Sequence, residues 1–420
     1  MKRFILPVLF FILVISSKSR AADIIKNGEL LNLDRCIEIA LTKHPNMIAS
    51  ANTVNVNQSR VGQAEANYYP QVTLTSGYKK LSGPPGDSFD QYSTGVSLNQ
   101  NIYDFGKTPT QVKIQDLNLE SSRSDLENVS EQIIFNVRQA YYKVLQARRN
   151  RDVSADTVKQ FQLHLEQAKG FYEVGTRPKF DVTKAEVDLS NAKLNLIKAE
   201  NALRISIVNL NNAIGIPDAQ EYSVEDNLSF EGYNITFEDA IKRAYENRPD
   251  LKSIITKKDV AAGSIDLAKK GYYPALTGNA SYNWSGEKFP LEDEWNIGAS
   301  LSIPIFSGYL TTYQVEESRA NLNALNADEE LLRQNIFLDV QQAYLNLREA
   351  EERIPTAELT VKQAEENFGI AKGRYEAGVG NPVELTDAEV ALVNAKTAYI
   401  QALYDYRTAQ AILEKAMGTR

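Results

Sequence analysis

The sequence predicts a mixed fold, in which a membrane β-barrel shared between several chains is continued by a long α-helical barrel. Three observations support this prediction. The 420-residue chain repeats itself at an offset of about 203 residues. Each copy holds two segments in which polar and apolar residues alternate, which is typical of strands. Each copy also holds about 60 residues almost without Gly or Pro, which predicts a helix much longer than a globular core can use.

The N-terminal segment has the pattern of a secretory signal peptide. Met-Lys-Arg is followed by an apolar run from Phe4 to Ile15 and by small residues, so we expect residues 1–21 to be removed. This run is shorter than the roughly 20 apolar residues that a spanning helix needs, and we expect no transmembrane helix in the mature chain. Removal takes away four of the 46 basic residues, which leaves 42 against 54 acidic residues. This balance argues against nucleic acid as a partner.

The duplication sets the expected domain boundaries. A period this long excludes a solenoid, whose repeats reach roughly 50 residues. The register is visible in two pairs of segments: Tyr68-Tyr69-Pro70 with Tyr272-Tyr273-Pro274, and Gln139-Ala140-Tyr141 with Gln342-Ala343-Tyr344. We expect three parts in the mature chain: a first structural repeat at 22–215, a linker of little periodicity at 216–234 and a second structural repeat at 235–420.

Each repeat begins with two helices. In the first repeat, Leu33 and Ile37 mark a short amphipathic helix that stops at Pro45, and a second helix is expected to run to about Asn67. Cys36 lies in the short helix and is expected in the core. As the only Cys of the chain, it cannot form an internal disulfide.

A β-hairpin follows in each repeat, at about 70–103 and about 274–306. One face of its strands is apolar, and the other is small and polar. This pattern is typical of a barrel wall with lipid outside and water inside. We therefore expect Leu276, Leu301 and Ile303 to face lipid, and Asn279 and Ser300 to face the interior. The alternative is half of a soluble β-sandwich.

The hairpins also limit the assembly. Trp284 and Trp295 lie beside the second hairpin loop, where they fit an interfacial aromatic girdle or, in the alternative, the core of a soluble sheet. Four strands cannot close a membrane barrel, which needs about eight. Open sheet edges are not tolerated in lipid. Several chains must therefore share one barrel, and the long helices must continue it as a tube.

The long helices are expected at 110–169 and 309–368, with Pro355 inside the second. Near their far ends, apolar residues recur at spacings of three and four, which predicts a heptad seam. Its members are Val158, Phe161, Leu165, Ala168 and Tyr172 in the first repeat, and Val361, Ala364, Phe368, Ala371 and Tyr375 in the second. The seam returns after turns that contain Gly175 in the first repeat and Gly378 and Gly380 in the second. Each repeat is therefore expected to end in an antiparallel helical hairpin.

The composition argues against an enzyme. The chain has two histidines, His44 and His164, and lacks a Cys pair, a His-Glu-x-x-His motif, a Gly-rich phosphate loop and a Gly-x-Ser-x-Gly motif. His164 falls beside the seam and is expected to be solvated. We expect no catalytic residue, no metal site and no cofactor.

The chain resembles the outer-membrane efflux proteins, the TolC-like exit ducts of Gram-negative bacteria. Besides the duplication and the paired motifs above, the resemblance rests on two tips, YEVGTRPKFDVTKAEV and YEAGVGNPVELTDAEV, each with Asn-Ala-Lys downstream. It covers the whole mature chain. The resemblance implies a homotrimer with a twelve-stranded barrel in the lipid of the outer membrane. A periplasmic coiled-coil tunnel continues this barrel and closes at the helix tips.

The resemblance also implies a periplasmic gate. In the family, a Tyr and an Arg of the second tip bond to an Asp of the first tip, and two acidic residues of the second tip ring the pore. Carried over by position, the Tyr is Tyr375, the Asp is Asp181, and the ring is Glu384 and Asp387.

The Arg of the family's latch has no counterpart in the second tip, where Gly380 stands. Arg177 occupies the matching place of the first tip, so we expect a latch that is rebuilt or weaker. Simpler interpretations stay open, because Gly175 and Gly378 fit ordinary helix C-caps and acidic residues are favoured at any helix start.

The implied function is that of an outer-membrane channel in a tripartite efflux or type I secretion system. Such a channel is a passive exit duct for substrates delivered by an inner-membrane transporter and a periplasmic adaptor. The alternative is a non-conducting coiled-coil scaffold or adaptor that spans the periplasm. That alternative does not require lipid-compatible alternation in both hairpins.

Overall fold

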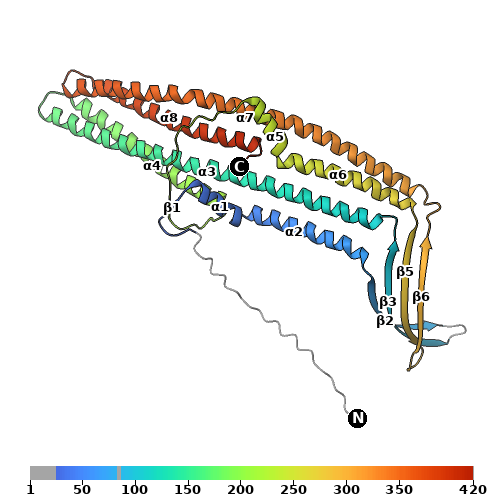
Figure 1. The fold of residues 1–420 in the computed structure, drawn as a ribbon. Coiled ribbons are helices and arrows are strands. Elements are labelled where there is room, and N and C mark those ends of the chain that lie inside the picture. Colours follow the sequence, from blue (N-terminus) through green and yellow to red (C-terminus); the bar gives the residue numbers. More distant parts are fainter. Residues whose placement is uncertain (1–24, 83–86, 420) are drawn as a thin grey trace, which may run out of the picture.

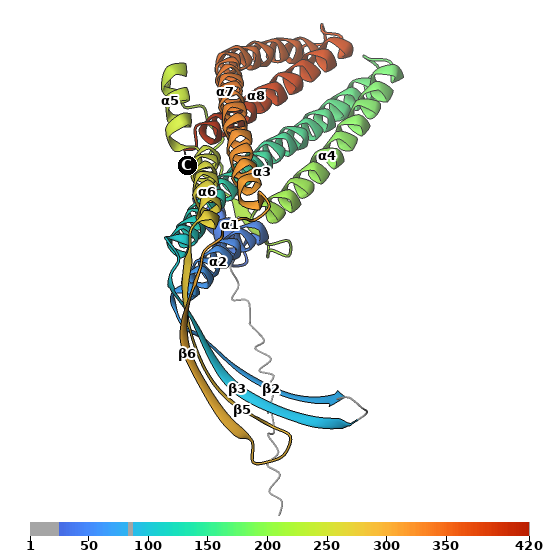
Figure 2. The ribbon, with the colours of Figure 1, turned by 90° about the vertical axis from the view of Figure 1, so that its right-hand side faces the viewer.

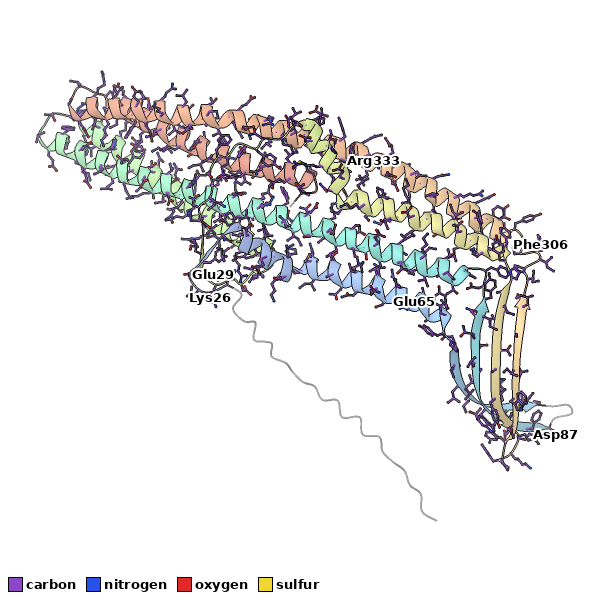
Figure 3. The ribbon with its side chains drawn as sticks, viewed as in Figure 1. Lys26, Glu29, Glu65, Asp87, Phe306 and Arg333 are labelled. Atoms are coloured by element: carbon purple, nitrogen blue, oxygen red, sulfur yellow. The ribbon has the colours of Figure 1, made fainter. Side chains whose placement is uncertain are left out.

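A computed structural model describes residues 25–82 and 87–419 of the chain. The expected signal peptide lies outside these residues. The helices form one elongated bundle, and a curved sheet projects from one end of it (Figure 1). Phe306 lies where the bundle meets the sheet, and Asp87 lies at the far end of the sheet (Figure 3).

The described elements follow one another in the same order twice. The first series is β1 (Glu29–Leu31), α1 (Leu33–Lys43), α2 (Pro45–Glu65), η1 (Ala66–Tyr68), β2 (Gln71–Ser82), β3 (Ser88–Tyr103), α3 (Lys107–Glu173) and α4 (Lys179–Ala213). The second series is β4 (Tyr222–Val224), α5 (Phe237–Asn247), α6 (Pro249–Lys269), η2 (Lys270–Tyr272), β5 (Ala275–Gly286), β6 (Glu292–Ser302), α7 (Leu310–Glu376) and α8 (Pro382–Ala416). The domain boundaries at 215 and 235 stay predictions; they fall between α4 and β4 and between β4 and α5.

The short helices begin where the sequence supplies caps. The side chain of Asn32 accepts a hydrogen bond from the Arg35 N–H of α1 at 2.9 Å, and Thr236 accepts one from Asp239 of α5 at 3.1 Å. Such caps satisfy backbone donors that the first helical turn leaves free. The helices α2 and α6 begin at Pro45 and Pro249, and proline is well suited to the first helical position.

The hairpins join into one antiparallel sheet of order β2-β3-β5-β6 in the described part of the chain. Residues that are directly opposite share a face, so the register groups the side chains. Leu276 lies opposite Leu301, and Ser300 lies opposite Thr277. The sheet bends strongly along its strands (Figure 2). By this register, the face that carries Leu276 and Leu301 is mainly apolar toward the helices and gains charged residues toward the hairpin loops, and the other face is rich in Thr, Ser and Asn.

The long helices build two hairpins, one from α3 and α4 and one from α7 and α8. Both α3 and α7 contain 67 residues, and at 1.5 Å per residue each spans roughly 100 Å. The helix α7 continues through Pro355. The two hairpins extend away from the sheet as separate pairs (Figure 2). Of the helices in the described residues, none has both the length and the apolar character that a membrane span requires.

The main core lies midway along the bundle, where the short helices α1 and α5 pack against α3, α7 and α8. Tyr141 and Tyr406 are fully buried there, and their hydroxyl groups donate to the backbone carbonyls of Glu225 and Glu231. Cys36 is also fully buried, which confirms the prediction that it belongs to the core. The tyrosines therefore attach the connection between the two halves to the long helices.

That connection, residues 216–234, is more ordered than its lack of periodicity indicated. It contains β4, which pairs in parallel with β1. Arg149 binds both carboxylate oxygens of Asp226, at 3.1 and 2.9 Å, and Arg148 donates to the carbonyl of Val224 at 2.7 Å. Neither short strand was predicted, because a three-residue strand is too short to show a period.

Two side-chain expectations were wrong. His164 lies beside the seam of the first hairpin, which alone would leave it exposed. It is buried, with 8% of its surface exposed, because α8 of the second hairpin packs over it. Tyr172 was expected in the seam but is 47% exposed, since the hairpin ends before that position is covered. Its counterpart Tyr375 is 2% exposed.

Candidate gate at the helix tips

The two helical hairpins end side by side at the tip of the bundle farthest from the sheet (Figure 1). Gly175 and Gly378 adopt left-handed backbones with φ of 75° and 78°, which L side chains rarely adopt. Gly380 is needed for a different reason. A Cβ atom at this position would lie 2.7 Å from the backbone nitrogen of Tyr375. The second tip therefore folds back so closely on α7 that it has no room for an Arg at position 380.

Arg177 of the first tip supplies a guanidinium group instead. It donates hydrogen bonds to the carbonyl of Gly380 at 2.7 Å and to that of Gly378 at 3.2 Å. Its Cζ atom lies 5.5 Å from the ring centroid of Tyr375, and its Nη1 lies 3.8 Å from the carboxylate of Asp181. One side chain thus contacts both tips and both of the residues expected to form the latch.

Asp181 and Tyr375 are brought together in a buried setting. They are 5% and 2% exposed and line the same small cavity of about 20 Å³. Within the described residues, Oδ2 of Asp181 has no hydrogen-bond partner. Burial raises the pKa of the Tyr375 hydroxyl, the Asp181 carboxylate raises it further, and Arg177 opposes both. The hydroxyl therefore stays protonated at neutral pH and remains a donor.

An apolar cluster holds the Tyr375 ring. Ala371 and Leu385 are buried beside it, and the ring of Phe171 meets it edge to face at 5.9 Å between centroids. This geometry is favourable for aromatic pairs. Phe171 belongs to the first hairpin, so the cluster also joins the two hairpins.

The two acidic residues expected to ring the pore lie on the exposed side of α8. Glu384 is about half exposed, and its carboxylate lies 3.3 Å from Nε of Arg374. Asp387 is exposed one turn further along. Asn381 caps this helix by accepting a hydrogen bond from the Val383 N–H at 2.9 Å. The Arg374 partner of Glu384 was missed, because its only signal in the sequence is a basic residue near a helix end.

A further contact between the hairpins was also missed. The carboxylate of Asp188 on α4 accepts from Lys184 at 2.9 Å and from the hydroxyl of Thr386 on α8 at 3.0 Å. Residues 188 and 386 are far apart in the sequence, so no local pattern could pair them. Asp188 therefore links the two hairpins one layer behind the tips.

Comparison with known proteins identifies the family of this chain. The model of the outer membrane efflux protein family matches residues 36–216 and 240–419. The chain belongs to this family. It is an outer-membrane efflux channel of a Gram-negative bacterium, and the family consists of transporters and not of enzymes.

The individual relatives are distant but extend over nearly the whole chain. The outer membrane protein TolC of Vibrio cholerae is 26% identical over 408 residues, which cover 92% of this chain and 91% of the relative. The crystal structure of CusC matches with a TM-score of 0.80 at 16% identity and covers 94% of this chain and 95% of CusC. The structure of VceC from Vibrio cholerae matches with a TM-score of 0.76 at 18% identity and covers 92% of this chain and 96% of VceC. The structural matches show the fold, and the family match supports an efflux channel over a non-conducting scaffold.

Proposed function

We propose that three copies of this chain form one exit duct, with a shared twelve-stranded barrel in the outer membrane and a helical tunnel across the periplasm. The observation that carries this proposal is the open sheet. Its outer strands, β2 and β6, each lack a partner on one side within the described chain. Unpaired edges are not tolerated in lipid, and a barrel needs about eight strands or more. Three four-stranded sheets satisfy both conditions.

The register supports a lipid-facing and a water-facing side for this barrel. Leu276 lies opposite Leu301 and Tyr282 opposite Trp295 on one face, while Asn279 lies opposite Gly298 on the other. We assign the first face to lipid and the second to the lumen. Leu301 is 61% exposed, and Ile303 just beyond β6 is 57% exposed, so a membrane has apolar surface to cover.

Aromatic residues indicate which end of the sheet lies at which membrane interface. Tyr282 and Trp284 pack at 4.6 Å between ring centroids near the hairpin loops, whereas Phe105 and Tyr273 stack at 5.9 Å near the helices. Aromatic girdles mark both interfaces of a membrane barrel. We therefore propose that the loops face the exterior and that the helices begin at the periplasmic interface.

The tips form the gate in this proposal. The duct is closed when Arg177 bonds to the second tip and stacks on Tyr375 beside Asp181. Hydrogen bonds to charged groups contribute about 1.5–3 kcal/mol, so three copies of the contact could approach the ~5.5 kcal/mol that moves a gate from mostly closed to mostly open. Partial exposure to solvent lowers this sum. The gate is thus strong enough to rest closed and weak enough to be opened by partners.

The partners are an inner-membrane transporter and a periplasmic adaptor, which deliver the substrate to the tips. Glu384 and Asp387 of three chains place six carboxylates at this entrance, and Arg374 partly neutralises Glu384. A ring of acidic residues favours cations.

Recording in a planar lipid bilayer tests the proposed function. The purified protein should give a small resting conductance that is selective for cations. Its conductance should rise when the tip contacts are removed. A protein that assembles and inserts but never conducts would contradict the proposal.

A further inference from the structure

A buried acid and a buried base face each other between the two hairpins, behind the proposed gate. His164 on α3 and Glu389 on α8 are 8% and 2% exposed. Their Nε2 and Oε2 atoms lie 3.6 Å apart. Among the described residues, Oε2 of Glu389 has no hydrogen-bond partner. Neither residue belongs to the latch described above.

Aromatic rings from both hairpins lie beside the pair, and the cavities next to it are lined by apolar and polar side chains alike. The ring of Phe161 on α3 lies 6.0 Å from that of His164, and the ring of Phe368 on α7 lies 6.4 Å from it, between centroids. A charge left unpaired in such a site is costly. We therefore expect the two groups to be buried either both neutral or both charged, and not with a single unpaired charge.

The charged groups that act on the pair come from two helices, α4 and α7. Asp188 on α4 acts on both groups, and so does Lys372 on α7, while Glu376 on α7 acts on His164. Asp188 is itself bound by Lys184 and Thr386. These groups oppose one another in sign, and burial has the largest influence on the pKa of each member of the pair.

We propose that His164 and Glu389 share one proton when the hairpins are packed together, and that this proton makes closing of the gate nearly independent of pH between about 5 and 7. The proposal rests on the proposed function of the tips. When α8 moves away from α3, both groups meet water, and the proton resides on the imidazole with the carboxylate ionised. When the hairpins pack, the proton passes toward the carboxylate. The number of protons bound is the same in both states, so linkage gives no pH dependence.

The direction of each pKa shift agrees with this exchange. Burial raises the pKa of Glu389 to about 7, Asp188 raises it further, and Lys372 opposes. Burial lowers the pKa of His164, and Lys372 lowers it further, while Asp188 and Glu376 oppose. Taken alone, a raised carboxyl pKa favours the packed state at low pH, and this contribution is lost as pH rises toward 7. Taken alone, a lowered imidazole pKa favours the packed state above the ordinary value of 6.5, and this contribution is lost as pH falls.

Removing one partner should therefore expose the pH dependence of the other. In His164→Gln, only Glu389 titrates, so the open fraction should rise at least about tenfold from pH 5 to pH 7.5, since each unit of pKa difference corresponds to a factor of ten. In Glu389→Gln, only His164 titrates, and the open fraction should rise severalfold as pH falls over the same range. The wild type and the double variant should both be nearly flat.

The experiment uses the full-length channel and two readouts at pH 5.0–7.5. Open probability in planar bilayers reports on the gate. Hydrogen exchange of residues 160–168 and 385–393, corrected for the intrinsic effect of pH, reports on hairpin packing and does not depend on conduction. Glu186→Gln, an exposed position on α4, is the matched control and should behave as the wild type.

The two variants distinguish this proposal from the proposed function. Opposite slopes in the two single variants support the shared proton. Equal slopes, or two flat profiles, overturn it while leaving the channel intact. If no protein conducts, the proposed function fails, and the exchange profiles still decide whether the pair behaves as described.

Discussion

The guanidinium group of Arg177 lies over the ring of Tyr375, with 5.5 Å between Cζ and the ring centroid. Arg177 belongs to the first helical hairpin and Tyr375 to the second, so this contact crosses between the two halves of the chain. Gly380 makes it possible, because the tight second tip presents its carbonyl group to Arg177. Arg177 thus joins the tips by other contacts than the resemblance implied, because its hydrogen bonds go to backbone carbonyls of the second tip and not to Asp181.

Arg177→Ala should raise the resting conductance. The substitution removes two hydrogen bonds and the contact with Tyr375, and each bond to a charged group contributes about 1.5–3 kcal/mol before solvent reduces it. We expect at least about a tenfold rise in open probability, which corresponds to 1.4 kcal/mol. Lys179→Ala, an exposed basic position in the same tip, should leave conductance unchanged. Equal effects of the two substitutions would show that only net charge matters.

Gly380→Ala should disturb the second tip, although Ala is a mild substitution elsewhere. Its Cβ atom would lie 2.7 Å from the backbone nitrogen of Tyr375, and overpacking typically costs about 1–3 kcal/mol. Gly373→Ala is the matched control, because nothing lies within 4 Å of a Cβ atom there and Ala favours a helix. Limited proteolysis of the tip should speed up only for position 380. Equal cleavage of both variants would refute the close approach.

The two faces of the barrel wall should respond differently to charge. Leu301→Arg places a guanidinium group in lipid, which costs about 2–4 kcal/mol near the bilayer midplane, whereas Ser300→Arg places it in the watery lumen. The amount of assembled protein in the outer membrane should fall only for Leu301→Arg. Equally poor assembly of both variants would show that the two faces are wrongly assigned.

The entrance should select cations through Glu384 and Asp387. Replacing both with Ala should lower the ratio of cation to anion permeability and weaken block by trivalent cations. Arg374→Ala should do the opposite, because it frees the carboxylate that lies 3.3 Å from Arg374. Reversal potentials in a salt gradient measure the ratio. Unchanged reversal potentials in both variants would mean that these residues do not line the pore.

Features with a local period could be predicted from the sequence. The alternation in the strands, the scarcity of Gly and Pro in the long helices and the buried position of Cys36 each depend on neighbours along the chain. The family resemblance then identified Asp181 and Tyr375, and the structure places both in one buried cluster at the tips.

Features that depend on packing between the hairpins could not be predicted in this way. His164 looked solvated because the helix that covers it is α8, more than 200 residues away in the sequence. The contact of Asp188 with Thr386 has the same origin. The short strands β1 and β4 lacked enough residues to show a pattern. In each case the missing information was which distant segments lie together.

The central claim is that three chains make one duct, and the native mass of the detergent-solubilised protein tests it most directly. A mature channel with a shared barrel should have three times the mass of the processed chain. The Arg177→Ala variant should have the same mass, because this substitution changes the helix tips and leaves the sheet unaltered. A protein that is only monomeric or dimeric while it inserts and conducts would contradict the shared barrel.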